Sequence, residues 1–122
     1  MNRRRSKTLT VLRRREEFLA AAQQGKKWVA PGLILQIGIA RNDDTPSRIR
    51  YGLTASGKVG IAVIRNRARR RLRALAVEVL PPHAAPGHDY VLIARGTTIT
   101  RDFSDLRGDL TTALQKLGAW HE

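Results

Sequence analysis

Arginine is concentrated in one short segment of this chain, residues 65–73. Six of these nine residues are arginine. A guanidinium group forms paired hydrogen bonds with phosphate and stacks on nucleobases, whereas the ammonium group of lysine acts as a compact point charge. The segment therefore predicts contacts with a phosphate-rich partner, made by several side chains of the same kind.

Side chains that could catalyse a reaction are scarce in the rest of the sequence. The chain has no cysteine. Its three histidines either flank a loop rich in proline and glycine or lie near the end of the chain: His83, His88 and His121. This distribution fits neither a metal site nor a histidine-activated nucleophile. We therefore predict no catalytic residue in the protein itself.

The acidic residues do not suggest a metal site either. Glu16–Glu17 and Asp43–Asp44 are adjacent pairs, so their side chains point apart. Asp102, Asp105 and Asp109 follow a helical spacing that predicts a solvated acidic face, whereas a hard cation needs converging oxygen atoms. The sequence thus predicts no metal ligands in this protein.

Apolar residues spaced three or four positions apart predict a helix beneath the arginines. They are Ile61, Ile64, Ala68, Leu72, Leu75 and Val79. Opposite this stripe on a helical wheel lie Asn66, Arg69, Arg70 and Arg73, with Arg67 and Arg71 beside it. We expect the helix to end near Leu80, before Pro81–Pro82. Its apolar face would pack against a core while its guanidinium groups face a partner.

Positive charge is strong and uneven along the chain. The net charge is +13, with 19 basic and 4 acidic residues in 1–73 against 4 basic and 6 acidic residues in 74–122. A polyphosphate partner fits this pattern, because each neutralised phosphate releases condensed counterions. An acidic membrane surface fits less well, because the apolar stripe contains no Trp or Phe. Neither a membrane-spanning run nor a secretory signal is evident, so we expect a cytoplasmic protein without a membrane partner.

The remaining pattern predicts one small domain of mixed helices and strands. We expect a flexible basic arm over residues 1–8, a single RNA-binding domain over 9–119 and a tail over 120–122. Predicted elements inside the domain are helices over 12–24 and 103–117 and strands over 33–40, 48–54 and 89–96. A turn over 42–47 would make the first two strands antiparallel partners. The fold class is α+β, a sandwich of helices on a mostly antiparallel four-stranded sheet with one βαβ crossover.

The arginine segment and its approach resemble the arginine–asparagine–arginine helix of the protein subunit of bacterial ribonuclease P. The matching residues are Lys58, Val59, Gly60, Ala62, Val63, Arg65, Asn66, Arg67, Arg69, Arg70 and Arg73. Further matches are Arg50, Gly52 and Ser56 upstream, Arg15, Glu17 and Phe18 in the first helix, and Asp89, Val91 and Arg95 near the last strand. The chain departs from the family pattern at Ala22, Gln36, Gly57 and Ala74, where relatives often carry an aromatic residue, tyrosine, lysine and glutamate.

The resemblance implies a protein subunit that is not itself catalytic. In that family the RNA subunit holds the catalytic Mg2+ ions and cuts precursor tRNA, and no small-molecule substrate is involved. The protein would contact this catalytic RNA through Lys58, Arg65, Asn66, Arg67, Arg69, Arg70 and Arg73. It would contact the single-stranded 5′ leader of precursor tRNA through Phe18, Gln36 and Arg14. A left-handed crossover around the basic helix is also implied, against the general right-handed rule.

Other interpretations of the sequence remain open. A ribosomal or other structural RNA-binding protein would have the same size and charge. Phe18 could pack in the core, as most lone aromatic residues on helices do, rather than stack on RNA. A DNA-binding helix fits less well, because strands rather than a helix and a turn precede the basic helix.

Overall fold

The computed structural model describes residues 9–23, 26–39 and 49–120. The predicted basic arm over 1–8 and the predicted turn over 42–47 lie outside these residues. The elements follow in the order β1 (Leu9–Val11), α1 (Arg15–Gln23), β2 (Lys26–Val29), β3 (Leu33–Ile39), β4 (Ile49–Thr54), α2 (Ala62–His83), β5 (His88–Ala94), the 3-10 helix η1 (Gly96–Ile99) and α3 (Phe103–Lys116).

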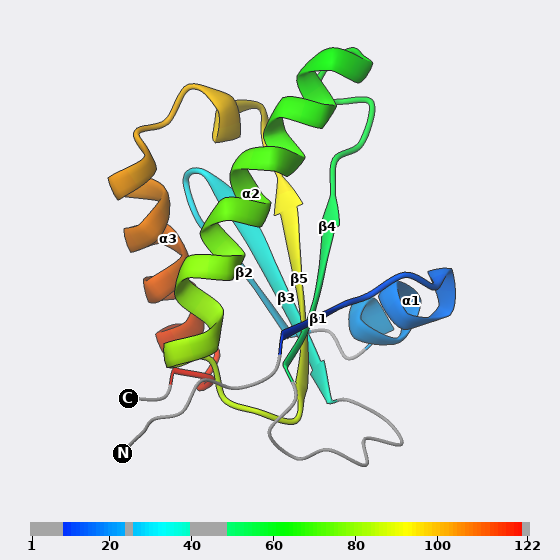
Figure 1. Cartoon of the computed structure of the whole chain (residues 1–122), viewed down its shortest axis with the longest axis vertical. Coiled ribbons are helices and arrows are strands. Elements are labelled where there is room, and N and C mark those ends of the chain that lie inside the picture. Colours follow the sequence, from blue (N-terminus) through cyan, green and yellow to red (C-terminus); the bar gives the residue numbers. More distant parts are fainter. Residues whose placement is uncertain (1–8, 24–25, 40–48, 121–122) are drawn as a thin grey trace.

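The strands form one five-stranded mixed sheet in the order β1-β4-β5-β3-β2. β1 with β4 and β4 with β5 pair in parallel, whereas β3 with β5 and β2 with β3 pair antiparallel. Helices α2 and α3 cover one face of the sheet, and α1 lies on the other (Figure 1). The α+β class is confirmed, but the prediction of a mostly antiparallel four-stranded sheet is wrong.

The errors in the predicted sheet have identifiable physical causes. β1 has three residues and β2 has four, which is too short for an alternation of apolar and polar side chains to stand out. The predicted pairing of β3 with β4 is wrong because β5 lies between them. β5 enters the sheet only after the long helix α2, so its position depends on contacts that local sequence does not encode.

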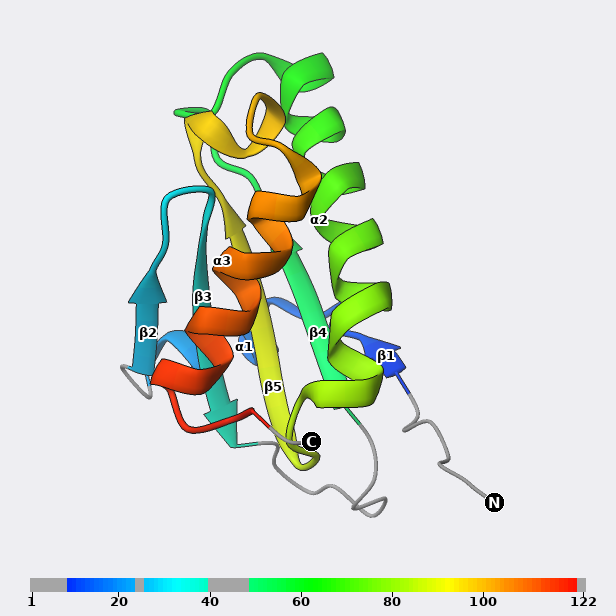
Figure 2. The ribbon, with the colours of Figure 1, turned by 90° about the vertical axis from the view of Figure 1, so that its left-hand side faces the viewer.

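Helix α2 connects the parallel neighbours β4 and β5. In Figure 2, with α2 in front of the sheet and both strands running upward, β5 lies to the left of β4. The crossover is therefore left-handed, opposite to the usual rule for this unit. This is the handedness that the family resemblance implied.

The main core lies between the sheet and the two helices α2 and α3. Its fully buried side chains come from β3, β4, β5, α2 and α3, and include Leu33, Leu35, Ile37, Ile49, Tyr90, Leu92, Leu72, Leu75, Leu106, Leu110 and Leu114. The predicted stripe of α2 is confirmed at its buried positions Ala68, Leu72, Leu75 and Val79. Ile61, by contrast, is 72% exposed and precedes the helix.

Helix α2 extends further than the sequence predicted. It runs through Pro81 and Pro82 and ends at His83. A proline inside a helix leaves the carbonyl group four residues earlier without its amide partner. Those residues are Val77 and Glu78, which are both exposed. Because both residues are on the solvent side of the helix, water can satisfy their carbonyl groups, and the two prolines do not have to end it.

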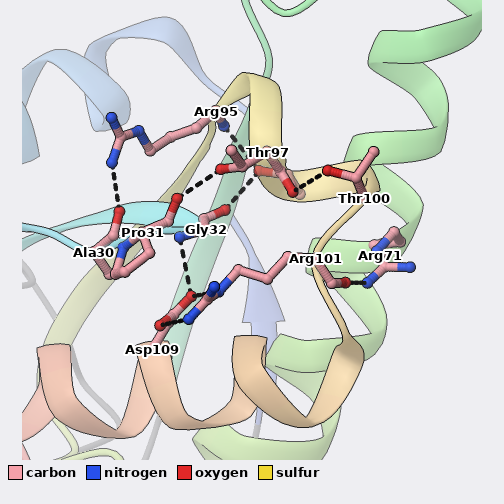
Figure 3. Close-up of polar contacts among 10 residues, drawn as sticks. Ala30, Pro31, Gly32, Arg71, Arg95, Thr97, Thr100, Arg101 and Asp109 are labelled. Carbon is pink, nitrogen blue, oxygen red and sulfur yellow. Dashed lines mark hydrogen bonds and ion pairs between the residues drawn. The ribbon is translucent and has the colours of Figure 1, made fainter.

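The segment between β2 and β3 is held against η1 and α3 by hydrogen bonds from side chains (Figure 3). Asp109 accepts a hydrogen bond of 3.0 Å from the Gly32 amide, and the Nε of Arg101 lies 2.7 Å from its Oδ2. Because Asp109 is only 7% exposed, its predicted place on a solvated acidic face is wrong. Asp102 and Asp105 are exposed, as expected. Asp109 is a structural anion, and its hydrogen bond raises the pKa of Arg101.

The predicted tail does not begin at residue 120. Trp120 forms a bridge in the antiparallel sense with Ala84. Its ring stacks on that of His83, with 4.2 Å between the ring centroids. Trp120 therefore belongs to the domain, packed at the end of α2, while residues 121–122 lie outside the described part of the chain.

A three-residue ionic cluster attaches α1 to the other face of the sheet. Arg50 of β4 forms two bonds with Asp89 of β5, at 2.7 Å from Nε and 2.8 Å from Nη2. Its Nη1 lies 3.1 Å from Oε2 of Glu17 in α1. The other oxygen of Glu17 accepts the backbone amides of Arg13 and Arg14, each at 3.0 Å. Glu17 therefore accepts hydrogen bonds from amides at the start of α1 with one oxygen and forms an ion pair with Arg50 of β4 with the other.

This arrangement predicts a specific pH dependence of stability. The Arg14 amide, then the Arg13 amide and the charge of Arg50, hold the pKa of Glu17 below its ordinary value of 4.5, against the opposing effect of burial. A lowered carboxyl pKa stabilises the fold at pH values above 4.5, and this contribution is lost as the pH falls through the lower pKa of the folded state. We expect Glu17→Gln to lower the free energy of unfolding by about 1 kcal/mol at pH 7 and by much less at pH 3.

Urea unfolding at the two pH values, followed by circular dichroism, measures this difference. Glu16→Gln is the matched control, because Glu16 is exposed and precedes Glu17 directly. A loss of stability in Glu17→Gln that is equal at pH 7 and pH 3 would contradict the assignment.

Candidate nucleic-acid interface

The arginine row of α2 faces away from the core. Asn66, Arg67, Arg70 and Arg73 are exposed, and Arg65 and Arg69 are half-buried. Arg69 donates a hydrogen bond to the Oδ1 of Asn66. Within the described ranges, none of these arginines forms an ion pair with a carboxylate. Charges that are held on a rigid helix without internal partners are available to an external anion.

The loop before α2 lies beside this row. Lys58 is exposed there, and its amide is directed to the Ser56 hydroxyl at 3.3 Å. The position of a β-carbon on Gly57 would be 3.8 Å from Nη1 of Arg65. The N-cap residue of α2 is Ile61, and no side chain caps this end of the helix, so Ser56 is not its cap. The loop and the first turns of α2 therefore form one basic surface.

Arg71 differs from the other arginines of the segment. It donates a hydrogen bond to the carbonyl oxygen of Arg101 (Figure 3). Its guanidinium carbon lies 5.9 Å from the centre of the Phe103 ring. Its Nε is buried and has no hydrogen-bond partner among the described residues. The helical wheel placed Arg71 beside the apolar stripe, and the structure turns it toward α3. Arg71 joins two helices and is not part of the exposed row.

The face of the sheet opposite α2 carries the other predicted contact residues. The register aligns Gly52 of β4, Val91 of β5 and Gln36 of β3 in one row across the sheet. Phe18 of α1 lies over Gly52, where an added β-carbon would stand 2.4 Å from its Cε1 atom. Phe18 is half-buried and packs with Leu12, Ala21, Val91 and Ile93. The ring is thus neither fully in the core nor free.

The same row contains a basic residue that the sequence analysis did not single out. Lys27 of β2 pairs with Gln36 and is exposed, so it projects from the same face of the sheet. The sequence offered no signal for it, because β2 was not recognised as a strand. Arg14 is exposed just before α1. Phe18, Gln36 and Lys27 therefore share one face, with Arg14 at the start of the helix that covers it.

The described ranges contain neither a cluster of metal-binding side chains nor a helix that could cross a membrane. Among the described residues, no three His, Cys, Asp or Glu side chains come together in a way that could hold a metal ion. No helix in the described part of the chain is both long enough and apolar enough to cross a membrane.

Comparison with known proteins agrees with this geometry. The family model described as Ribonuclease P matches residues 7–118. The ribonuclease P protein component of Paramagnetospirillum magneticum is 49% identical over 112 residues, which cover 91% of this chain and 84% of the relative. The corresponding protein of Caulobacter vibrioides is 49% identical over 108 residues, 88% of this chain and 70% of the relative.

Solved structures give the same result for the fold. The RNase P protein of Staphylococcus aureus has a TM-score of 0.73 at 20% identity, covering 91% of this chain and 97% of that chain. The RNase P protein from Thermotoga maritima has a TM-score of 0.68 at 25% identity, covering 83% and 91%. Because the family model matches nearly the whole chain and two curated relatives are 49% identical to it, this chain belongs to the ribonuclease P protein component family.

Proposed function

We propose that this chain is the non-catalytic protein subunit of a cytoplasmic ribonuclease P ribonucleoprotein, in which the RNA subunit cuts precursor tRNA. Family membership makes the chain an RNA-binding protein of tRNA processing. The exposed arginine row of α2, which pairs with no carboxylate among the described residues, is the observation that carries the proposal. The Mg2+ ions that cleavage needs would be held mainly by the RNA, as the family resemblance implies.

In this proposal α2 and the preceding loop bind the RNA subunit. The contacts are made by Lys58, Arg65, Asn66, Arg67, Arg69, Arg70 and Arg73. From Arg65 to Arg73 the row rises about 12 Å along the helix axis, which allows contacts with several phosphates. Because the buried side of α2 is fixed against the sheet, the helix backbone needs no further ordering on binding, and the cost is confined to the arginine side chains. The rigid row favours a folded RNA of matching shape.

The opposite face of the sheet would bind the leader of precursor tRNA. Phe18 offers part of its ring for stacking on a base, and Gln36 offers an amide that can both donate and accept hydrogen bonds. Arg14 supplies a charge at the rim of the same face. Two surfaces on opposite sides of one sheet would allow a single domain to hold the RNA subunit and the substrate together.

The ribosomal alternative has less support. Size and charge fit it equally well, but it does not account for the family match over residues 7–118.

Reconstitution separates the two functions: the protein is mixed with a bacterial ribonuclease P RNA and precursor tRNA at low Mg2+. We expect faster removal of the leader than with the RNA alone. An unchanged rate would contradict the proposed function.

One prediction concerns the arginine row. We expect Arg70→Gln to weaken binding to the RNA subunit roughly three- to tenfold and to lower the slope of log affinity against log salt by about one unit. Filter binding over a series of KCl concentrations measures both quantities. Arg107→Gln is the matched control, because Arg107 is also exposed on a helix but is paired with Glu78. Equal salt slopes in the two variants would contradict the proposed contact.

A second prediction concerns the Phe18 ring. We expect Gly52→Ala to displace this ring, because the new β-carbon would lie 2.4 and 2.6 Å from two ring carbons. Since a stacked base contributes about 1–3 kcal/mol, the preference for precursor over mature tRNA should fall roughly fivefold or more. Binding to the RNA subunit should not change.

Substrate affinities of the reconstituted complex measure this preference, with Phe18→Ala as the positive comparison. Gly108→Ala is the matched control, since a β-carbon at the exposed Gly108 of α3 would meet nothing within 4 Å. If Gly52→Ala kept the full preference while remaining folded, the ring would not be a leader contact.

A further inference from the structure

Arg50 is an arginine on the proposed leader-binding face that the charge pattern alone would assign to phosphate binding. It lies in β4 two residues before Gly52, and the register places it beside Asp89 on the same face of the sheet. Its side chain is 19% exposed. A partly accessible guanidinium group next to Phe18 could contact RNA directly or could act through its neighbours.

The contacts of Arg50 favour the indirect role. Two of its nitrogens are bonded to the two oxygens of Asp89, and a third lies 3.1 Å from Glu17. Paired bonds of this kind between guanidinium and carboxylate are among the strongest in proteins. Asp89 is only 4% exposed, so removing its partner would leave a buried charge. A leader phosphate would have to compete with two carboxylates that are already in place.

Helix α1 depends on this cluster because its apolar attachment is small. Only Ala21 of its nine residues is fully buried, and Leu19 is 48% exposed. Phe18, which directly follows Glu17, is half-buried over Gly52. The link from Arg50 to Glu17 therefore fixes the start of α1 at the residue next to the stacking ring.

We infer that Arg50 is a positioning residue of the leader-binding face: it fixes α1, and with it the Phe18 ring, through Glu17, and it does not bind phosphate. This inference rests on the proposed function, since it assumes that this face receives the leader. It assigns the two carboxylates a role as well. Asp89 orients the guanidinium group, and Glu17 transmits its position to the helix.

The test uses the ribonucleoprotein reconstituted from the full chain, a ribonuclease P RNA and tRNA with or without a leader. Arg50→Lys keeps the charge but loses the fork that reaches both carboxylates. We expect it to reduce the leader-dependent gain in affinity about three- to tenfold without changing the salt slope. A lysine that retained the full gain would overturn the inference, because a simple phosphate contact tolerates that exchange.

Glu17→Gln provides the second variant and leaves the pair of Arg50 with Asp89 in place. If Arg50 positions α1, the leader-dependent gain falls. If Arg50 is instead a phosphate contact, removing a competing carboxylate raises the gain and steepens the salt slope by about 0.7. Glu16→Gln, with the same change of charge one residue away, should leave the gain unchanged. Circular dichroism verifies that each variant is folded at the pH of the assay.

The wild-type complex separates failure of the inference from failure of the proposed function. If wild-type protein gives no leader-dependent gain, the proposed leader-binding face is wrong and the inference fails with it. If the wild type shows the gain and Glu17→Gln matches or exceeds it, only the role of Arg50 is overturned.

Discussion

Burial of one side of α2 against the sheet is the constraint on which the rest of this structure depends. Ala68, Leu72, Leu75 and Val79 occupy the core between the sheet and the two helices α2 and α3. Because side chains three and four residues apart share a helix face, burying this stripe determines where the arginines between them can point. The hydrophobic effect thus orients the charged groups, although the charges themselves contribute little to the core.

The sheet then separates two chemically different surfaces. Alternate residues of a strand point to opposite faces, so Leu35, Ile37, Tyr90 and Leu92 pack beneath α2 and α3. Their neighbours Gln36, Asp89 and Val91 project from the other face, beside α1. Only a glycine at position 52 leaves room for the Phe18 ring to lie on this second face. One layer of backbone therefore supports both the basic helix and the partly apolar surface behind it.

Arginine has two distinct uses in this protein, and burial of an acidic partner distinguishes them. Arg50 and Arg101 are each held by a buried aspartate, Asp89 and Asp109. The pair of Arg50 with Asp89 joins two strands that are distant in the sequence. The pair of Arg101 with Asp109 fixes the segment before α3 against that helix. Arg70 and Arg73 have no such partner within the described residues and remain exposed. A count of basic residues alone does not separate the arginines that hold the fold together from those that we propose bind RNA.

The sequence by itself determined the amphipathic helix, the α+β class and the family motif, because these depend on residue types at short, regular spacings. Only the tertiary structure decided the order of the strands, since the pairing of β5 between β3 and β4 joins segments separated by a long helix. It also decided that Arg71, Arg50 and Asp109 face inward and that Lys27 lies beside Gln36. The reason is physical. The period of a helix depends on residues that are close in the sequence, whereas the partner of a charge or of a strand is determined only when distant segments pack together.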